Sequence, residues 1–186
     1  MLLFVGLGNP TPDSENNRHN IGFKMIDAIN QNFKLSKQKP KFKGLLTTGN
    51  IEDKKIYAIK PLTFMNNSGI CIRELIEYFK IDPENITVFH DDLDIDFGKV
   101  KAKFSGASAG HNGIESIDKF IGKDYSRVRI GIGKPKTKAD VSDHVLKDFD
   151  LDEIKELEKI TSKIINSIPI LIDKKLDLFS STINNK

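Results

Sequence analysis

The segment from Val5 to Gly22, VGLGNPTPDSENNRHNIG, constrains the fold of this chain more than any other stretch. It continues a short apolar run and reaches Gly6 and Gly8, where the missing side chain permits a tight turn or a close backbone approach. An asparagine–proline pair then starts a turn, because the residue before a proline is pushed out of the helical region. After a polar loop that contains His19, apolar residues recur at helical spacing. The order predicts strand, loop and helix, with the loop at the carboxyl end of the strand, where open α/β folds bind ligands.

The composition is typical of one water-soluble globular domain. The 186 residues are 38% hydrophobic and 30% charged, which suffices for a substantial core. The single cysteine, Cys71, cannot form an intrachain disulfide and is predicted to be buried in a helix. The N-terminus lacks the basic and apolar segments of a signal peptide, and no apolar window approaches the ~18 residues of a membrane span. We therefore expect a cytoplasmic protein that does not enter a membrane.

Hydrophobic periodicity predicts an alternating series of strands and helices. The expected strands are residues 2–7, 44–51, 55–60, 86–89, 99–104 and 127–132, and the expected helices are residues 21–34, 70–79, 114–121 and 152–168. The second and third strands form a hairpin, so the sheet is not entirely parallel. Pro169 should break a C-terminal helix that covers residues 152–179. We predict an α/β fold, a single domain of residues 1–186 with a mixed twisted β-sheet and helices on both faces.

Unusual polar residues follow the expected strands. They are Asn9 with His19, Met65 with Asn66, Asp91, and His111 with Asn112. A carboxylate such as Asp91 can orient a histidine and stabilise its protonated form, so that the histidine acts as a base near neutral pH. Asparagine amides can bind an amide or a developing oxyanion. These residues also have a purely structural interpretation, because asparagines and serines are common in turns and helix caps.

Other kinds of site receive less support from the sequence. The acidic run Asp91, Asp92, Asp94 and Asp96 offers ligands for Mg²⁺ or Ca²⁺, but without EF-hand spacing. Zinc-ligand spacing, the third glycine of a dinucleotide fingerprint, a P-loop lysine and a G-x-S-x-G motif are all missing from the sequence. We therefore expect no metal and no cofactor.

Basic residues alternate along two expected strands, Lys99–Lys103 and Arg127–Arg129. Residues two apart in a strand project to the same face. If the two strands lie in one sheet, Lys101, Lys103, Arg127 and Arg129 can border one groove. Several cations on one side can neutralise a nucleic-acid backbone, so this face is a candidate phosphate-binding surface.

Taken together, the motifs resemble those of bacterial peptidyl-tRNA hydrolases. The motifs are VGLGNP, RHNIG, PLTFMNNSG, HDDLDI, GHNG and RVRIGIGKP, in this order over residues 2 to about 149. The resemblance implies a metal-independent, cofactor-free monomer that hydrolyses the ester between a peptide and the 3′ ribose of tRNA, and so recycles tRNA from aborted translation. Its partner would be peptidyl-tRNA, recognised at its acceptor stem and 3′ end.

The resemblance also implies roles for individual residues. His19 corresponds to the base that activates water, Asp91 to the residue that orients it, and Asn9 to the residue that senses the blocked amine. The implied substrate-binding residues are Ser14, Phe64, Met65, Asn66 and Asn112, and those for the tRNA backbone are Lys101, Lys103 and Arg129. The chain departs from the family pattern at a few positions, with Ser14 in place of tyrosine, Asn17 in place of threonine, Ala107 and Ala109 in the glycine-rich loop, and His144 in place of an aromatic residue.

Two alternative functions remain open at the level of the sequence. A non-catalytic RNA-binding protein on the same fold is expected to have lost catalytic residues, whereas this chain keeps His19, Asp91, Asn9 and Asn66. A metal-dependent phosphoesterase that uses the acidic run would lose its activity in a chelator.

Overall fold

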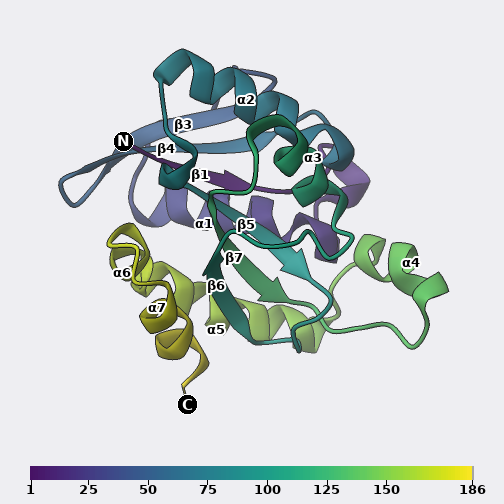
Figure 1. Cartoon of the computed structure of the whole chain (residues 1–186). Coiled ribbons are helices and arrows are strands. Elements are labelled where there is room, and N and C mark those ends of the chain that lie inside the picture. The colour runs from purple at the N-terminus through teal and green to yellow at the C-terminus, as the bar shows by residue number, and fades with distance from the viewer. Residues whose placement is uncertain (186) are drawn as a thin grey trace.

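A seven-stranded mixed sheet forms the centre of the molecule (Figure 1) in a computed structural model that describes residues 1–185. The strands are β1 (Leu2–Gly6), β2 (Lys39–Lys41), β3 (Gly44–Ile51), β4 (Lys54–Pro61), β5 (Ile86–Asp92), β6 (Val100–Phe104) and β7 (Ser126–Gly131). Their order across the sheet is β2-β3-β4-β1-β5-β7-β6. The central strands β4, β1, β5 and β7 run parallel, and β2, β3 and β6 join antiparallel. The predicted mixed α/β sheet is confirmed.

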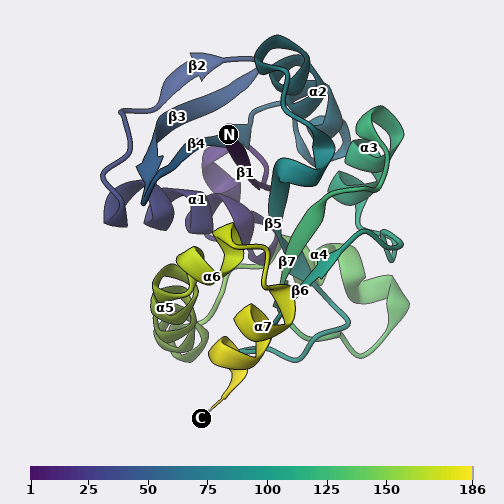
Figure 2. The same cartoon turned by 60° about the vertical axis from the view of Figure 1, so that its left-hand side comes forward.

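Helices cover both faces of this sheet (Figures 1 and 2). They are α1 (Ile21–Asn32), α2 (Ser68–Phe79), α3 (Asn112–Ile121), α4 (Val141–Leu146), α5 (Leu151–Asn166), α6 (Ile168–Ile172) and α7 (Leu176–Asn184). Helices α2 and α3 pack on one face, whereas α1, α5, α6 and α7 pack on the other. Helix α4 projects beyond the carboxyl ends of the parallel strands. None of the helices in residues 1–185 combines the length and apolarity needed to cross a membrane.

The alternation of side chains in β1 divides the core into two layers. Phe4 packs with α1 and the C-terminal helices, and Leu3 and Val5 pack with α2 and α3. Each such buried side chain contributes about 1.5–3 kcal/mol through removal of apolar surface from water. Cys71 is fully buried in the second layer, and burial raises the pKa of its thiol to about 12. Its predicted burial in a helix is confirmed.

Three elements differ from the expectation. Strand β2 lies between the expected helix 21–34 and the expected strand 44–51, where no strand was predicted, and α4 lies in a segment for which no helix was predicted. The C-terminal region forms three helices instead of two, and the last of them continues to Asn184. Pro169 lies in the first turn of α6, where a missing N–H costs no hydrogen bond, so the break falls before the proline at Ser167. A three-residue strand and a helix of less than two turns are too short to show a hydrophobic period.

The two edges of the sheet are protected in different ways. On β6, the Asn184 side chain both accepts a hydrogen bond from the Val100 N–H (3.0 Å) and donates to the Val100 carbonyl (2.7 Å). The Ser180 hydroxyl of the same helix, α7, accepts from the Ala102 N–H. At the other edge, β2 has the sequence Lys-Pro-Lys and is fully exposed. Charges and a proline on an edge strand oppose pairing with another sheet.

Two glycines allow α1 to approach the sheet at backbone distance. A Cβ atom on Gly22 would lie 2.3 Å from the Leu7 nitrogen and 2.3 Å from the Phe89 oxygen. A Cβ atom on Gly6 would lie 2.2 Å from the Gly22 oxygen. Since real carbon atoms do not approach this closely, only glycine fits at either position. The contact fixes the start of α1 directly against the ends of β1 and β5.

Replacing Gly22 with alanine should therefore destabilise the protein. The added methyl group meets rigid backbone, and we expect a loss of about 1–3 kcal/mol in the free energy of unfolding, measured by urea denaturation. Gly49→Ala is the matched control, because its methyl group would meet mainly the flexible end of the Leu35 side chain. An equal loss in the two variants would contradict the importance of the α1 contact.

Candidate active site

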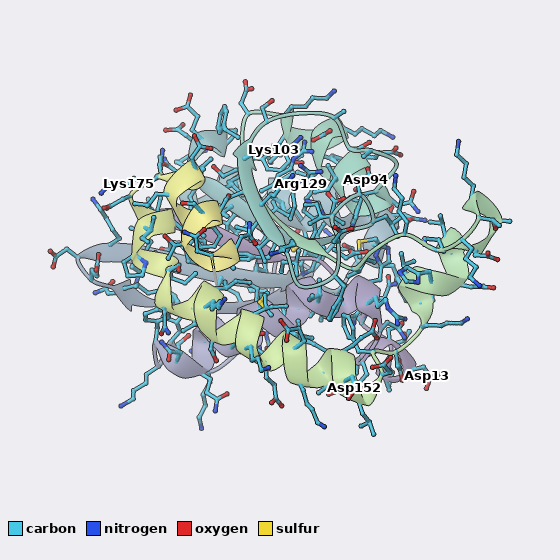
Figure 3. All side chains as sticks on the ribbon, turned by 90° about the horizontal axis from the view of Figure 1, so that it is seen from below. Asp13, Asp94, Lys103, Arg129, Asp152 and Lys175 are labelled. Atoms are coloured by element: carbon cyan, nitrogen blue, oxygen red, sulfur yellow. The ribbon has the colours of Figure 1, made fainter. Side chains whose placement is uncertain are left out.

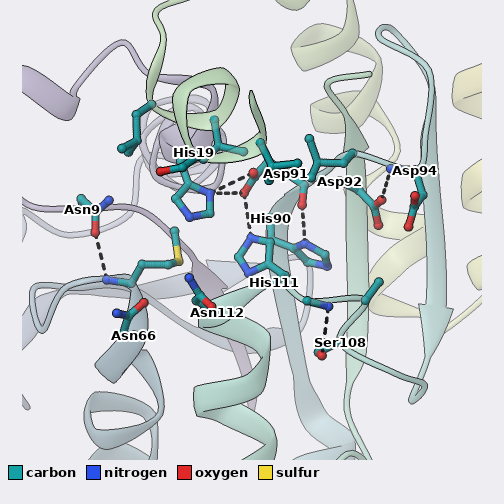
Figure 4. Close-up of a pocket in the computed structure, with 18 of the residues that line it drawn as sticks. Asn9, His19, Asn66, His90, Asp91, Asp92, Asp94, Ser108, His111 and Asn112 are labelled. Carbon is teal, nitrogen blue, oxygen red and sulfur yellow. Dashed lines mark hydrogen bonds and ion pairs between the residues drawn. The ribbon is translucent and has the colours of Figure 1, made fainter. Parts of the chain in front are cut away.

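A cleft of about 690 Å³ lies at the carboxyl ends of the parallel strands (Figure 4). Seven of the predicted site residues line it: Asn9, His19, Phe64, Met65, Asn66, Asp91 and Asn112. They come from the loops after β1 and β4, from the end of β5, and from the start of α3. Ser14 does not line the cleft, and its hydroxyl is hydrogen-bonded to Thr11 (2.7 Å). Lys101, Lys103 and Arg129 lie outside it as well.

His19 and Asp91 form the predicted pair. The His19 Nδ1 atom lies 3.0 and 2.9 Å from the two carboxylate oxygens of Asp91. His19 lies in a short 3-10 turn immediately before α1, so the close approach of Gly22 to the sheet brings its ring to the end of β5. A carboxylate accepts hydrogen bonds, so Nδ1 carries the proton and Nε2 keeps its lone pair. The pair therefore has the tautomer of a general base.

His111 is a third member of this group, and the sequence predicted no role for it. Its Nε2 atom lies 2.8 Å from the Asp91 Oδ1 atom. Its Nδ1 atom accepts hydrogen bonds from the backbone N–H groups of Gly113 (3.1 Å) and Ile114 (3.3 Å), and so caps α3. These two donors require a lone pair on Nδ1, which places the proton on Nε2, facing the carboxylate. Histidine is not a favoured N-cap residue, so the sequence carried little signal for this role.

The charge states in the group follow from burial and from these contacts. Burial alone would raise the pKa of the Asp91 carboxyl, but electrostatic attraction to His111 and His19, together with the hydrogen bonds that these rings donate, holds it far below its usual range. Asp91 is therefore ionised. His90, whose Nδ1 donates to the Asp91 carbonyl (2.7 Å), behaves in the opposite way. Burial, followed by the nearby His111, lowers its pKa to about 3, so this ring is neutral.

His19, Asp91 and His111 each offer an atom that could bind a metal ion, and these atoms lie within 4.8 Å of one another. Among residues 1–185 this is the one group with such an arrangement. A neutral histidine that binds a metal through Nε2 carries its proton on Nδ1 and donates it to an acceptor. At its Nδ1 atom, His111 faces two N–H donors and no acceptor, so its geometry opposes metal binding through Nε2. In the acidic run, Asp92 is paired with Arg129 (2.7 Å) and Asp94 with Lys134 (2.8 Å). These carboxylates do not form a free ligand set.

Asparagine side chains line the other side of the cleft. The Asn9 side-chain oxygen accepts from the Met65 N–H (2.9 Å), so its NH₂ group is the part of the amide that makes no hydrogen bond to the described residues. The preceding Phe64 has φ of +62° and ψ of +159°, a combination that is costly for any residue with a side chain. This strained turn directs the Met65 N–H at Asn9. The side chains of Asn66 and Asn112 make no hydrogen bond to the described residues and remain available to a substrate.

The basic residues lie on the expected face of the sheet, but one of them is buried there. Lys101 is opposite Arg129 and Lys103 is opposite Arg127 in the register of β6 and β7. Figure 3 shows Lys103 and Arg129 beside each other, and Asp92 holds the Arg129 Nε atom. Burial, followed by the charges of Arg129 and Arg127, lowers the pKa of the Lys103 ammonium. Arg127 is only 2% exposed, so its predicted place on a phosphate-facing surface is wrong.

The mixed sheet and the cleft at the carboxyl ends of its parallel strands are those of an α/β enzyme. A model of the peptidyl-tRNA hydrolase family matches residues 3–186, and the chain belongs to this family. It is 86% identical to the peptidyl-tRNA hydrolase of Pelagibacter ubique over all of both chains. It is 44% identical to that of Ehrlichia canis, over 98% of this chain and 94% of the relative. The crystal structure of the Acinetobacter baumannii peptidyl-tRNA hydrolase superposes with a TM-score of 0.93, at 32% identity, over 99% of this chain and 94% of that one.

Two substitutions of His111 should separate its two contacts. Asparagine can still cap α3 but cannot reach Asp91, whereas alanine can do neither. We expect both variants to lose hydrolytic activity by roughly tenfold, because Asp91 loses one of its supports. Only His111→Ala should also lose about 0.5–2 kcal/mol of stability in urea denaturation. Full activity in His111→Asn would show that the contact with Asp91 has no functional role.

Proposed function

We propose that this protein hydrolyses the ester bond between a peptide, or another N-blocked aminoacyl group, and the 3′ ribose of tRNA. Membership of the peptidyl-tRNA hydrolase family supports the substrate class. The single observation that carries the chemistry is the bond between the His19 Nδ1 atom and the ionised Asp91 at the cleft. It leaves the His19 Nε2 atom as a base.

In the proposed reaction, His19 removes a proton from a water molecule, whose oxygen attacks the ester carbonyl carbon. Asp91 stabilises the imidazolium ion that forms. The free amides of Asn66 and Asn112 can donate to the oxyanion. The bond to the ribose 3′ oxygen then breaks, and this oxygen takes the proton from His19. The products are tRNA and a peptide carboxylic acid, which loses its remaining proton to solvent, and no Lewis acid is required.

The orientation of Asn9 suits a substrate with a blocked amine. Its oxygen is occupied by Met65, so it offers an NH₂ group to the ligand. An N-acyl group presents a carbonyl oxygen, which accepts a hydrogen bond. A free α-ammonium group has only hydrogen-bond donors, so it would place a donor against the NH₂ donor of Asn9. This mismatch would select peptidyl-tRNA over aminoacyl-tRNA.

The tRNA acceptor stem is proposed to lie on Lys101, Lys103 and Arg129. These side chains share one face of β6 and β7, beside the cleft. With Nε held by Asp92, both terminal nitrogens of Arg129 remain available for a phosphate. The expectations that the protein acts as a monomer, in the cytoplasm and without a metal or cofactor, remain part of this proposal. A role for Ser14 in substrate binding would be indirect, through the loop between Asn9 and His19.

Substitution of the base is the first test. His19→Ala should reduce kcat by about 10²–10⁴-fold with little change in tRNA affinity, because it removes proton transfer and leaves the phosphate contacts. Asp91→Asn should be less damaging, since it misplaces the imidazole proton. A non-catalytic RNA-binding protein would instead bind peptidyl-tRNA and leave it intact. Near wild-type turnover in His19→Ala would exclude the mechanism.

Removal of one basic side chain is the second test. Lys103→Ala and Arg129→Ala should raise KM for peptidyl-tRNA with little change in kcat. Each should also flatten the dependence of log affinity on log salt by about 0.7–0.9. Lys155→Ala is the matched control, because this exposed lysine lies on α5, on the opposite side of the sheet. An N-acetyl-aminoacyl ribose ester, which lacks the acceptor stem, should be hydrolysed alike by all three variants. Equal losses on both substrates would contradict the assignment.

A further inference from the structure

Arg127 in β7 is one of the largest fully buried side chains. Its Nη1 atom donates to the Ala107 carbonyl (2.9 Å) and its Nη2 atom donates to the Gly106 carbonyl (2.8 Å). A guanidinium group presents its N–H groups as a planar fork, so it can hold two consecutive carbonyls in one orientation. The side chain therefore fastens the loop of residues 105–111 to the sheet. We call this segment the His111 loop.

The backbone of the His111 loop adopts a conformation that needs such contacts to hold it in place. Ser105, Gly106, Ala109 and Gly110 have φ values between +51° and +112°. For Ser105 and Ala109 this conformation is disfavoured, because the Cβ atom crowds the backbone. Apart from Arg127, the backbone of the loop is tied to the sheet through the Ser105 N–H and the Tyr125 carbonyl (2.9 Å). The loop ends at the ring that supports Asp91.

The buried positive charge of Arg127 is balanced without involving the loop. Its Nη2 atom lies 3.2 Å from the Asp118 carboxylate on α3, and the Tyr125 hydroxyl donates to the same oxygen (2.7 Å). Asp118 therefore compensates the charge, while the two carbonyls determine where the loop lies. These contacts come from different elements and can be altered separately.

We propose that Arg127 is a positioning residue for hydrolysis, which acts by holding the His111 loop so that the His111 Nε2 atom reaches Asp91. Arg127 touches neither the cleft nor the substrate. This inference rests on the proposed function for its kinetic consequence. Its structural part, the order of the loop, can be measured without substrate.

Arg127→Lys is the first variant, because lysine keeps a cation near Asp118 but lacks the planar fork. The second is Arg127→Met combined with Asp118→Leu, which removes the ion pair as a whole and leaves no unpaired buried charge. In both, amide hydrogen exchange of residues 106–111 should become at least about tenfold faster, and kcat should fall on the order of tenfold, with KM within about twofold. Tyr125→Phe is the matched control, since it perturbs Asp118 without touching the loop, and it should keep wild-type exchange and kcat.

A double-mutant cycle with His111→Asn tests the route of the effect. If Arg127 acts through His111, Arg127→Lys should reduce kcat by less than about twofold in the His111→Asn background, because the contact is already lost. The same tenfold reduction in both backgrounds would overturn the proposal. Wild-type amide hydrogen exchange of the loop in the Arg127 variants would also overturn the proposal, whatever the activity of these variants. A wild-type protein that does not hydrolyse peptidyl-tRNA would instead refute the proposed function, and the exchange measurement would still decide the role of Arg127 in the loop.

Discussion

The contact between Gly6 and Gly22 is the constraint on which the site depends. With no side chain at either position, the start of α1 rests on the ends of β1 and β5 at backbone distance. The 3-10 turn that contains His19 immediately precedes this helix and Asp91 lies near the end of β5, so the same contact sets their separation. A longer spacing between helix and sheet would leave a charged carboxylate buried without its partners, which is costly. Packing and electrostatics thus select the same arrangement.

Asp91 contacts three imidazole rings, His19 and His111 through its carboxylate and His90 through its backbone carbonyl, and the surroundings give each ring a different state. His19 keeps a free lone pair toward the cleft, His111 is held as the Nε2–H form by two backbone donors, and His90 is kept neutral by burial. The same side chain therefore serves as a base, as a support and as a packing element. Neighbouring hydrogen bonds, more than residue identity, determine what each histidine can do.

Much of this arrangement could be predicted from the sequence, because strand and helix periods are local. The period of two in β6 and β7 correctly placed Lys101, Lys103 and Arg129 on one face. The same rule placed Arg127 on this face but did not reveal its burial, because periodicity does not show which part of a face a loop will cover. The support from His111 was not predicted, since it depends on a histidine that caps a helix, a position at which histidine is not favoured.

The last helix completes the sheet in place of an eighth strand. Side chains of α7 satisfy backbone groups of β6 that another strand would otherwise pair, and they do so at Val100 and Ala102. An edge strand without such cover is a template for association with other chains. The C-terminal segment therefore serves solubility as well as packing. Proteolytic trimming or a fusion that displaced α7 would favour intermolecular β-pairing and aggregation, even with every residue of the cleft intact.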